Sequence, residues 1–147
     1  MAEINHVLVP TDGSADACKA AAYAGDLARA LGARVSVLVV QSEDLIVPQT
    51  WGAGGMSVEE VRGKLEHEAR DKELPATVQA LGKLEPAVEQ HAIWGHPAEE
   101  ICRFAAEHNV DLIIMGSHGR SGLGRMLLGS VSNAVANQAS CPVTIVR

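Results

Sequence analysis

Residues 111–132 read DLIIMGSHGRSGLGRMLLGSVS, and this stretch decides the fold. Its first part, residues 111–115, is a short apolar run of the kind found in strands that are covered on both faces. A glycine-rich segment over residues 116–129 follows, and residues 130–139 have the pattern of a short helix. A buried strand that leads through a glycine-rich loop into a helix predicts an α/β protein with a parallel sheet.

The alternation of strands and helices continues on both sides of this stretch. Strands are predicted over residues 4–10, 34–40, 87–94 and 142–146, and helices over residues 15–31, after Ser57 and after His96. Residues 41–56 are predicted to form a loop. Pro75 must end, kink or restart the helix that Ser57 caps, and the state of residues 76–84 stays open. This order predicts one domain, residues 1–147, with an open five-stranded parallel sheet and helices on both faces.

The composition excludes several classes of protein. With 147 residues the chain has the size of a single domain, and 47% hydrophobic residues exclude disorder. A net charge of −6 and an aromatic content of 3% argue against a nucleic-acid partner. No apolar run reaches the roughly 20 residues of a membrane span, and residues 1–5 do not resemble a secretory signal. Three irregularly spaced cysteines predict free thiols and a cytoplasmic location.

The glycine-rich segment has the features of a phosphate-binding loop. Gly116 and Gly119 lack a Cβ atom, so that successive backbone N–H groups can approach an anion closely. Gly129 directly precedes the predicted last helix, whose first N–H groups and dipole favour a phosphate. The basic and hydroxyl side chains that accompany these glycines are His118, Arg120, Arg125, Ser130 and Ser132.

Three familiar loops do not fit this segment. Gly119 and Gly124 have the glycine spacing of a Walker A loop, but Arg125 and Met126 stand where that loop needs Lys and Ser or Thr. The first strand is not followed by the G-x-G-x-x-G of a dinucleotide-binding fold, and no G-x-S-x-G nucleophile elbow is present. The spacing that is present is G116-x2-G119-x9-G129-S130.

This spacing resembles the ATP-binding motif G-2x-G-9x-G-[ST] of the universal stress protein family, without departure. HVLVPTDGS at residues 6–14 and CPVTIVR at residues 141–147 are similar to family sequence as well. The resemblance spans the whole chain and is loosest over residues 41–92. It implies a Rossmann-like fold, related to the adenine nucleotide alpha hydrolases, with the sheet order 3-2-1-4-5.

The resemblance also implies a ligand, a site and an assembly. The ligand is ATP, with Mg²⁺ as an open addition, and the expected assembly is a homodimer through the last strand, Val143–Val146. Matching positions place Asp12 at the ribose or adenine edge, Val40 against adenine and Gly129 at the phosphates. The full set of expected binding residues is Pro10, Thr11, Asp12, Val40, Met115, Gly116, His118, Gly119, Arg120, Gly129, Ser130, Val131 and Ser132.

Several alternatives remain open from the sequence. Asp12 or Ser14 could act simply as a helix cap, and Ser130 and Ser132 could cap the last helix. His118 could be a solvated loop residue. The loop explains nucleotide binding better than turnover, because neither a Walker lysine nor an evident general base accompanies it. The expected function is therefore an ATP-binding regulatory protein of the stress response. A slow Mg²⁺-dependent ATPase or phosphotransferase, and a structural dimer that binds no nucleotide, are the alternatives.

Overall fold

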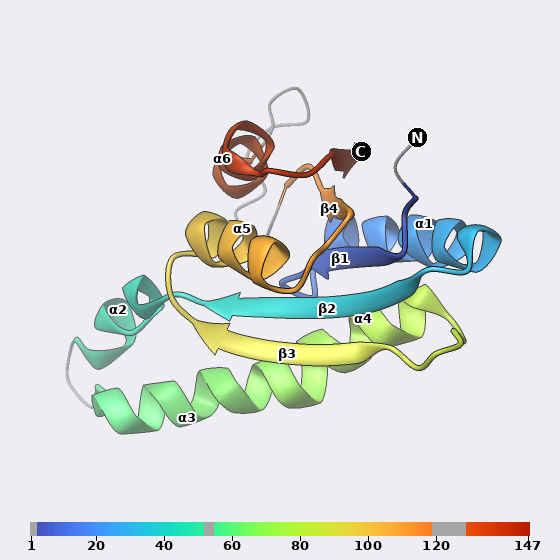
Figure 1. Ribbon diagram of the computed structural model, residues 1–147. Helices are drawn as coiled ribbons and strands as arrows, with labels where there is room; N and C mark the ends of the chain where they lie inside the picture. Colours follow the sequence, from blue (N-terminus) through green and yellow to red (C-terminus); the bar gives the residue numbers. More distant parts are fainter. Residues whose placement is uncertain (1–2, 52–54, 119–128) are drawn as a thin grey trace.

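The computed structural model describes residues 3–51, 55–118 and 129–147 (Figure 1). The strands are β1 (His6–Pro10), β2 (Arg34–Gln41), β3 (Glu89–Trp94), β4 (Leu112–Gly116) and β5 (Val143–Val146). The helices are α1 (Ala15–Leu31), α2 (Val47–Thr50), α3 (Val58–Glu68), α4 (Leu74–Leu81), α5 (Pro97–Glu107) and α6 (Ser130–Gln138). A 3₁₀ turn, η1 (Glu43–Leu45), precedes α2, and a π-helical turn, η2 (Ala69–Glu73), joins α3 to α4.

The sheet confirms the expected order. Within the described residues it has five strands in the order β3-β2-β1-β4-β5, and every neighbouring pair is parallel. The chain builds outward from β1 through β2 to β3 and then crosses back to place β4 on the other side of β1. The carboxyl ends of β1 and β4 therefore lie side by side where the strand order reverses, which is where ligands bind in such sheets.

Helices cover both faces of the sheet (Figure 1). The side chains of β1 alternate between the two layers: Val7 and Val9 join the core under α1 and α4, whereas Leu8 joins the core under α5 and α6. All three are fully buried. This two-sided burial accounts for the near-continuous apolar sequence of the strand. None of the helices in the described parts of the chain is long and apolar enough to cross a membrane.

Small side chains let α1 pack closely on its neighbours. The buried face of α1 consists of Ala17, Ala20, Ala21, Ala24, Gly25 and Ala28. Gly25 is the tightest point, because a Cβ atom there would lie 2.1 Å from the backbone oxygen of Leu81 in α4. Arg29, one turn further along α1, donates to the same oxygen at 2.9 Å. The end of α4 is thereby fixed against α1.

We predict that Gly25→Ala destabilises the protein by more than about 2 kcal/mol, because the added methyl group must displace backbone rather than a flexible side chain. Gly63→Ala in α3 is the matched control, since a Cβ there meets nothing within 4 Å. It should raise stability by about 0.5–1 kcal/mol. Urea unfolding of both variants measures the difference, and equal stabilities would contradict this account of α1 packing.

Residues 41–56 are predicted to form a loop, and that prediction is wrong for η1 and α2. The Ser42 hydroxyl caps η1 by accepting a hydrogen bond from the backbone N–H of Asp44 at 3.2 Å, and Pro48 lies in the first turn of α2. Ile46 anchors the segment by packing with Val61 and Leu65 of α3. The isolated sequence does not show this anchor, because it depends on a contact with a distant helix.

The helix after Ser57 follows its predicted start and resolves the open region beyond it. Ser57 accepts a hydrogen bond from the backbone N–H of Glu60 at 3.1 Å, as its N-cap role requires. Pro75 lies in the first turn of α4, where its missing N–H is tolerated. The π-helical turn η2 leads from α3 into α4. Residues 74–81 are therefore part of a helix, which answers the question that the sequence left open.

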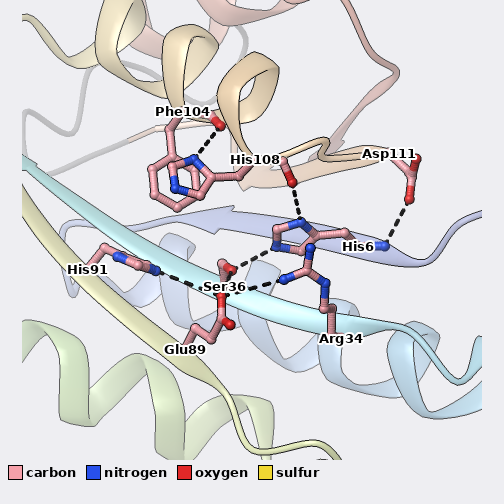
Figure 2. Close-up of polar contacts among 8 residues, drawn as sticks. All are labelled: His6, Arg34, Ser36, Glu89, His91, Phe104, His108 and Asp111. Carbon is pink, nitrogen blue, oxygen red and sulfur yellow. Dashed lines mark hydrogen bonds and ion pairs between the residues drawn. The ribbon is translucent and has the colours of Figure 1, made fainter.

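A buried histidine joins three strands at the amino end of the sheet (Figure 2). The Nδ1 atom of His6 donates to the backbone oxygen of His108 at 3.0 Å, and Nε2 lies 2.7 Å from the Ser36 hydroxyl. Ser36 in turn donates to a carboxylate oxygen of Glu89 at 3.0 Å, so its hydroxyl links His6 to β3. Burial lowers the pKa of His6 below its ordinary value of 6.5, although the bond to His108 opposes this.

We predict that acidification below pH 6.5 lowers the stability of this protein through His6. Because the folded pKa is below the unfolded one, the contribution is fully present above pH 6.5 and is lost as the pH falls. Glu89 stays outside this window, because the Ser36 hydrogen bond lowers its pKa below the ordinary 4.5. Urea unfolding at a series of pH values gives the free energy of unfolding as a function of pH. This free energy should change less steeply with pH in His6→Asn than in the wild type, and as steeply as in the wild type in His96→Asn, whose side chain is exposed.

Candidate functional site

A cavity of about 240 Å³ lies at the carboxyl ends of β1, β2 and β4, between α1, α5 and the start of α6. Its lining brings together segments that are more than a hundred residues apart in the sequence. The lining residues are Pro10, Thr11, Asp12, Ala17, Leu38, Val40, Pro97, Ile101, Met115, Gly116, His118, Gly129, Ser130, Val131 and Ser132.

Every expected binding residue that the structure describes lines this cavity. Gly119 and Arg120 lie outside the described residues. Sequence reasoning missed Ala17, Leu38, Pro97 and Ile101. The sequence shows that Leu38 and Ile101 are apolar, but it does not show that β2 and α5 border the same cavity.

One side of the cavity is apolar. Leu38 and Val40 of β2, Met115 of β4 and Ile101 of α5 line it, and Pro97 at the start of α5 adds a further apolar surface. Leu38 and Ile101 belong to the core under α5 and α6, so their positions are set by packing. An apolar wall of this kind suits the flat face of a ring system more than a charged group.

The start of α6 forms another part of the lining. Gly129 is the N-cap of this helix, and no side chain among the described residues caps it, so that part of the chain leaves the first N–H groups of α6 for an anion. The suggestion that Ser132 caps the helix is wrong. Its buried hydroxyl donates instead to the backbone oxygens of Ser117 at 2.9 Å and Gly129 at 3.1 Å. These bonds tie the end of β4 to the first turn of α6.

Two glycines permit the close approaches that shape the cavity. A Cβ at Gly116 would lie 2.9 Å from the backbone oxygen of Asp16, so the first turn of α1 rests directly on the end of β4. A Cβ at Gly129 would lie 3.0 Å from the backbone oxygen of Ser117. Both contacts are to backbone, which cannot move aside as a flexible side chain can. Larger residues at either position would therefore reshape the cavity.

The loop between β1 and α1 is fixed by local hydrogen bonds. Asp12 accepts from the backbone N–H of Ser14 at 2.9 Å, and Ser14 accepts from the backbone N–H of Ala17 at 3.2 Å. The N-cap of α1 is therefore Ser14, and the suggestion that Asp12 is merely the cap is wrong. Asp12 holds the turn before the helix and borders the cavity.

His118 is packed rather than solvated, with 13% of its side chain exposed. Its Nδ1 atom lies 3.0 Å from the Ser117 hydroxyl and 3.7 Å from a carboxylate oxygen of Asp16. The buried Nε2 atom has no hydrogen-bond partner among the described residues. In that same part of the chain, no group of three or more His, Cys, Asp or Glu side chains is arranged to hold a metal ion.

The strand order and the position of the cavity define an open α/β protein that has helices on both faces of its sheet and a cavity where the strand order reverses. The sequence model of the universal stress protein family matches residues 3–147, and the chain belongs to that family.

Known relatives agree with this assignment over the full length. Universal stress protein YxiE of Bacillus subtilis is 36% identical over 97% of this chain and 99% of its own length. The solved structure of MJ0577, a universal stress protein of Methanocaldococcus jannaschii, is 31% identical with a TM-score of 0.82, covering 99% of this chain and 96% of that one. A universal stress protein of Archaeoglobus fulgidus, solved in complex with dAMP, shares the fold at 24% identity, with a TM-score of 0.62 and full coverage of both chains.

Proposed function

We propose that this protein binds an adenine nucleotide in the cavity, with ATP as the ligand, and acts as a nucleotide-dependent regulatory module with little or no turnover. The observation that carries the proposal is the pairing of an apolar wall with an uncapped helix start across one cavity of about 240 Å³. A nucleotide has the same two-part chemistry, a flat base and an anionic phosphate chain. The dAMP complex of the Archaeoglobus protein supports this choice, because that protein has the same fold.

The cavity suggests a role for each group of residues. Val40 and Met115 pack against the base, and Asp12 accepts hydrogen bonds from the ribose. The phosphates lie toward the first turn of α6, where the N–H groups after Gly129 donate to them. Gly119 and Arg120 complete the phosphate loop in this proposal on the strength of the motif alone. Mg²⁺, if it accompanies ATP, is held mainly by the phosphates, since the described residues offer it no cluster of three ligands.

Binding without efficient turnover follows from what surrounds the phosphate end. Efficient phosphoryl transfer needs a positioned nucleophile and a metal held by acidic side chains. In the described part of the lining, Asp12 is the only carboxylate, and it holds the turn at Ser14. Helix N–H groups still stabilise phosphate charge, so slow hydrolysis is the alternative function.

The decisive experiment is to purify the protein without added nucleotide, denature it and identify the released molecules by mass spectrometry. We expect a near-stoichiometric adenine nucleotide. ATP rather than ADP would show that turnover is slow. An empty protein that also fails to bind added ATP by calorimetry would overturn the proposal and favour a structural dimer.

We predict that Gly129→Val abolishes ATP binding while the protein stays folded. The added side chain meets the Ser117 backbone and blocks the first N–H groups of α6. Gly63→Val in α3 is the matched control, because its side chain points into open space. Calorimetry reads out binding and thermal unfolding reads out folding. Normal ATP binding by folded Gly129→Val would place the phosphates elsewhere.

We also propose a homodimer through β5, in the cytoplasm. β5 ends the sheet and pairs with β4 along one edge in the described chain, so its other edge is open to a second copy. The three cysteines are free, as thiols in a reducing compartment are.

We predict that Thr144→Lys, which adds a charge to this half-buried strand, shifts the protein from dimer to monomer. Ser140→Lys is the control, because Ser140 is exposed just before the strand. Sedimentation equilibrium measures both variants. A Thr144→Lys protein that remains dimeric would rule out this interface.

A further inference from the structure

A chain of hydrogen bonds leads from the cavity into the helical layer below it. Thr11, which lines the cavity, lies with its hydroxyl 2.7 Å from the hydroxyl of Thr77 in α4. Thr77 donates to the backbone oxygen of Glu73 at 2.8 Å, and the backbone N–H of Gly13 donates to Thr11 at 3.0 Å. Thr77 is fully buried, so water does not reach its hydroxyl, and Thr11 is 9% exposed.

The direction of every bond in this chain is fixed. A backbone oxygen can only accept, so the single hydroxyl proton of Thr77 points to Glu73. Thr11 must therefore donate its own proton to Thr77, which leaves the Thr11 oxygen to accept from Gly13. Loss of the Thr77 hydroxyl would leave the hydroxyl proton of Thr11 without its acceptor. Thr11 would then rotate its side chain or shift the β1–α1 loop to reach another acceptor.

A second contact joins the same two segments. Gly13 lies so close to the π-helical turn that a Cβ there would be 3.0 Å from the Cα atom of Glu73. Its φ of 76° also lies in the left-handed region that favours glycine. The loop that presents Asp12 to the cavity therefore rests on η2 and α4, both through packing and through the hydroxyl chain. Single π-helical turns are often found at functional sites.

We propose that Thr77 is a positioning residue for the nucleotide site and that α4 senses its occupancy through Thr11. Thr77 borders no part of the cavity and acts by holding the β1–α1 loop in its binding geometry. Binding in turn restrains Thr11 and, through it, α4 and η2. This inference rests on the proposed nucleotide function. It identifies the residues through which nucleotide binding would affect the structure outside the cavity.

The test replaces the hydroxyl with a methyl group of the same shape. Thr77→Val should raise the Kd for ATP about tenfold, because the loop must be ordered on binding. Thr77→Ser keeps the hydroxyl and should bind as the wild type does, even if the lost methyl group lowers its stability. Thr50→Val is the matched control. Thr50 likewise donates to a backbone oxygen of its own helix, at 2.9 Å, but lies outside the cavity lining.

Hydrogen exchange with and without ATP supplies the second readout. ATP should slow amide exchange in residues 69–81 of the wild type and of Thr77→Ser, and this protection should disappear in Thr77→Val. Equal Kd values and equal protection in the wild type and Thr77→Val would overturn the inference and leave the nucleotide function standing. A wild type that binds no ATP would instead overturn the proposed function, and the inference would fall with it.

Discussion

The close packing of α1 is the constraint on which the rest of the structure depends. Its alanine face and Gly25 bring the helix against α4, where a side chain at Gly25 would collide with the Leu81 backbone. At the other end of α1, the absence of a Cβ at Gly116 lets the backbone of Asp16 rest on the end of β4. These two contacts fix how closely α1 packs on its neighbours and the direction in which it runs. The position of the β1–α1 loop, at the amino end of the helix, follows from this.

The cavity follows from that placement. The β1–α1 loop borders the cavity because α1 packs closely on the sheet. The first turn of α6 borders it because the Ser132 hydroxyl bonds to the backbone oxygen of Ser117. The apolar wall belongs to the core under α5 and α6, as Leu38 and Ile101 show. The described part of the site is thus built from elements whose positions are set by packing, and such preorganisation favours ligand binding.

The sequence predicts the sheet well because each strand carries its own signal. Burial on both faces makes strands apolar, and glycine and proline mark the ends of elements, so the alternation of strands with helices indicates a parallel sheet. The order of the strands within that sheet comes from the family resemblance. The described site residues follow from the glycine spacing and from the resemblance it supports. Ile101, Pro97 and Thr77 do not follow. Their relevance comes from contacts across the fold, and the bond between Thr11 and Thr77 spans 66 residues with a π-helical turn that no local pattern predicts.

A nucleotide can regulate a protein only if it binds two conformations with different affinity. The apolar part of the described cavity wall is unsuited to that task, because Leu38, Ile101 and Met115 are buried in the core. The β1–α1 loop differs, because besides its local bonds at Asp12 and Ser14 it is held by one hydroxyl pair and by a glycine that touches a π-helical turn. Single π-helical turns are frequent at functional sites, whereas the side chains of a packed strand are held by the core around them. The part of the site that rests on η2 and α4 is therefore the part through which we propose that occupancy is sensed.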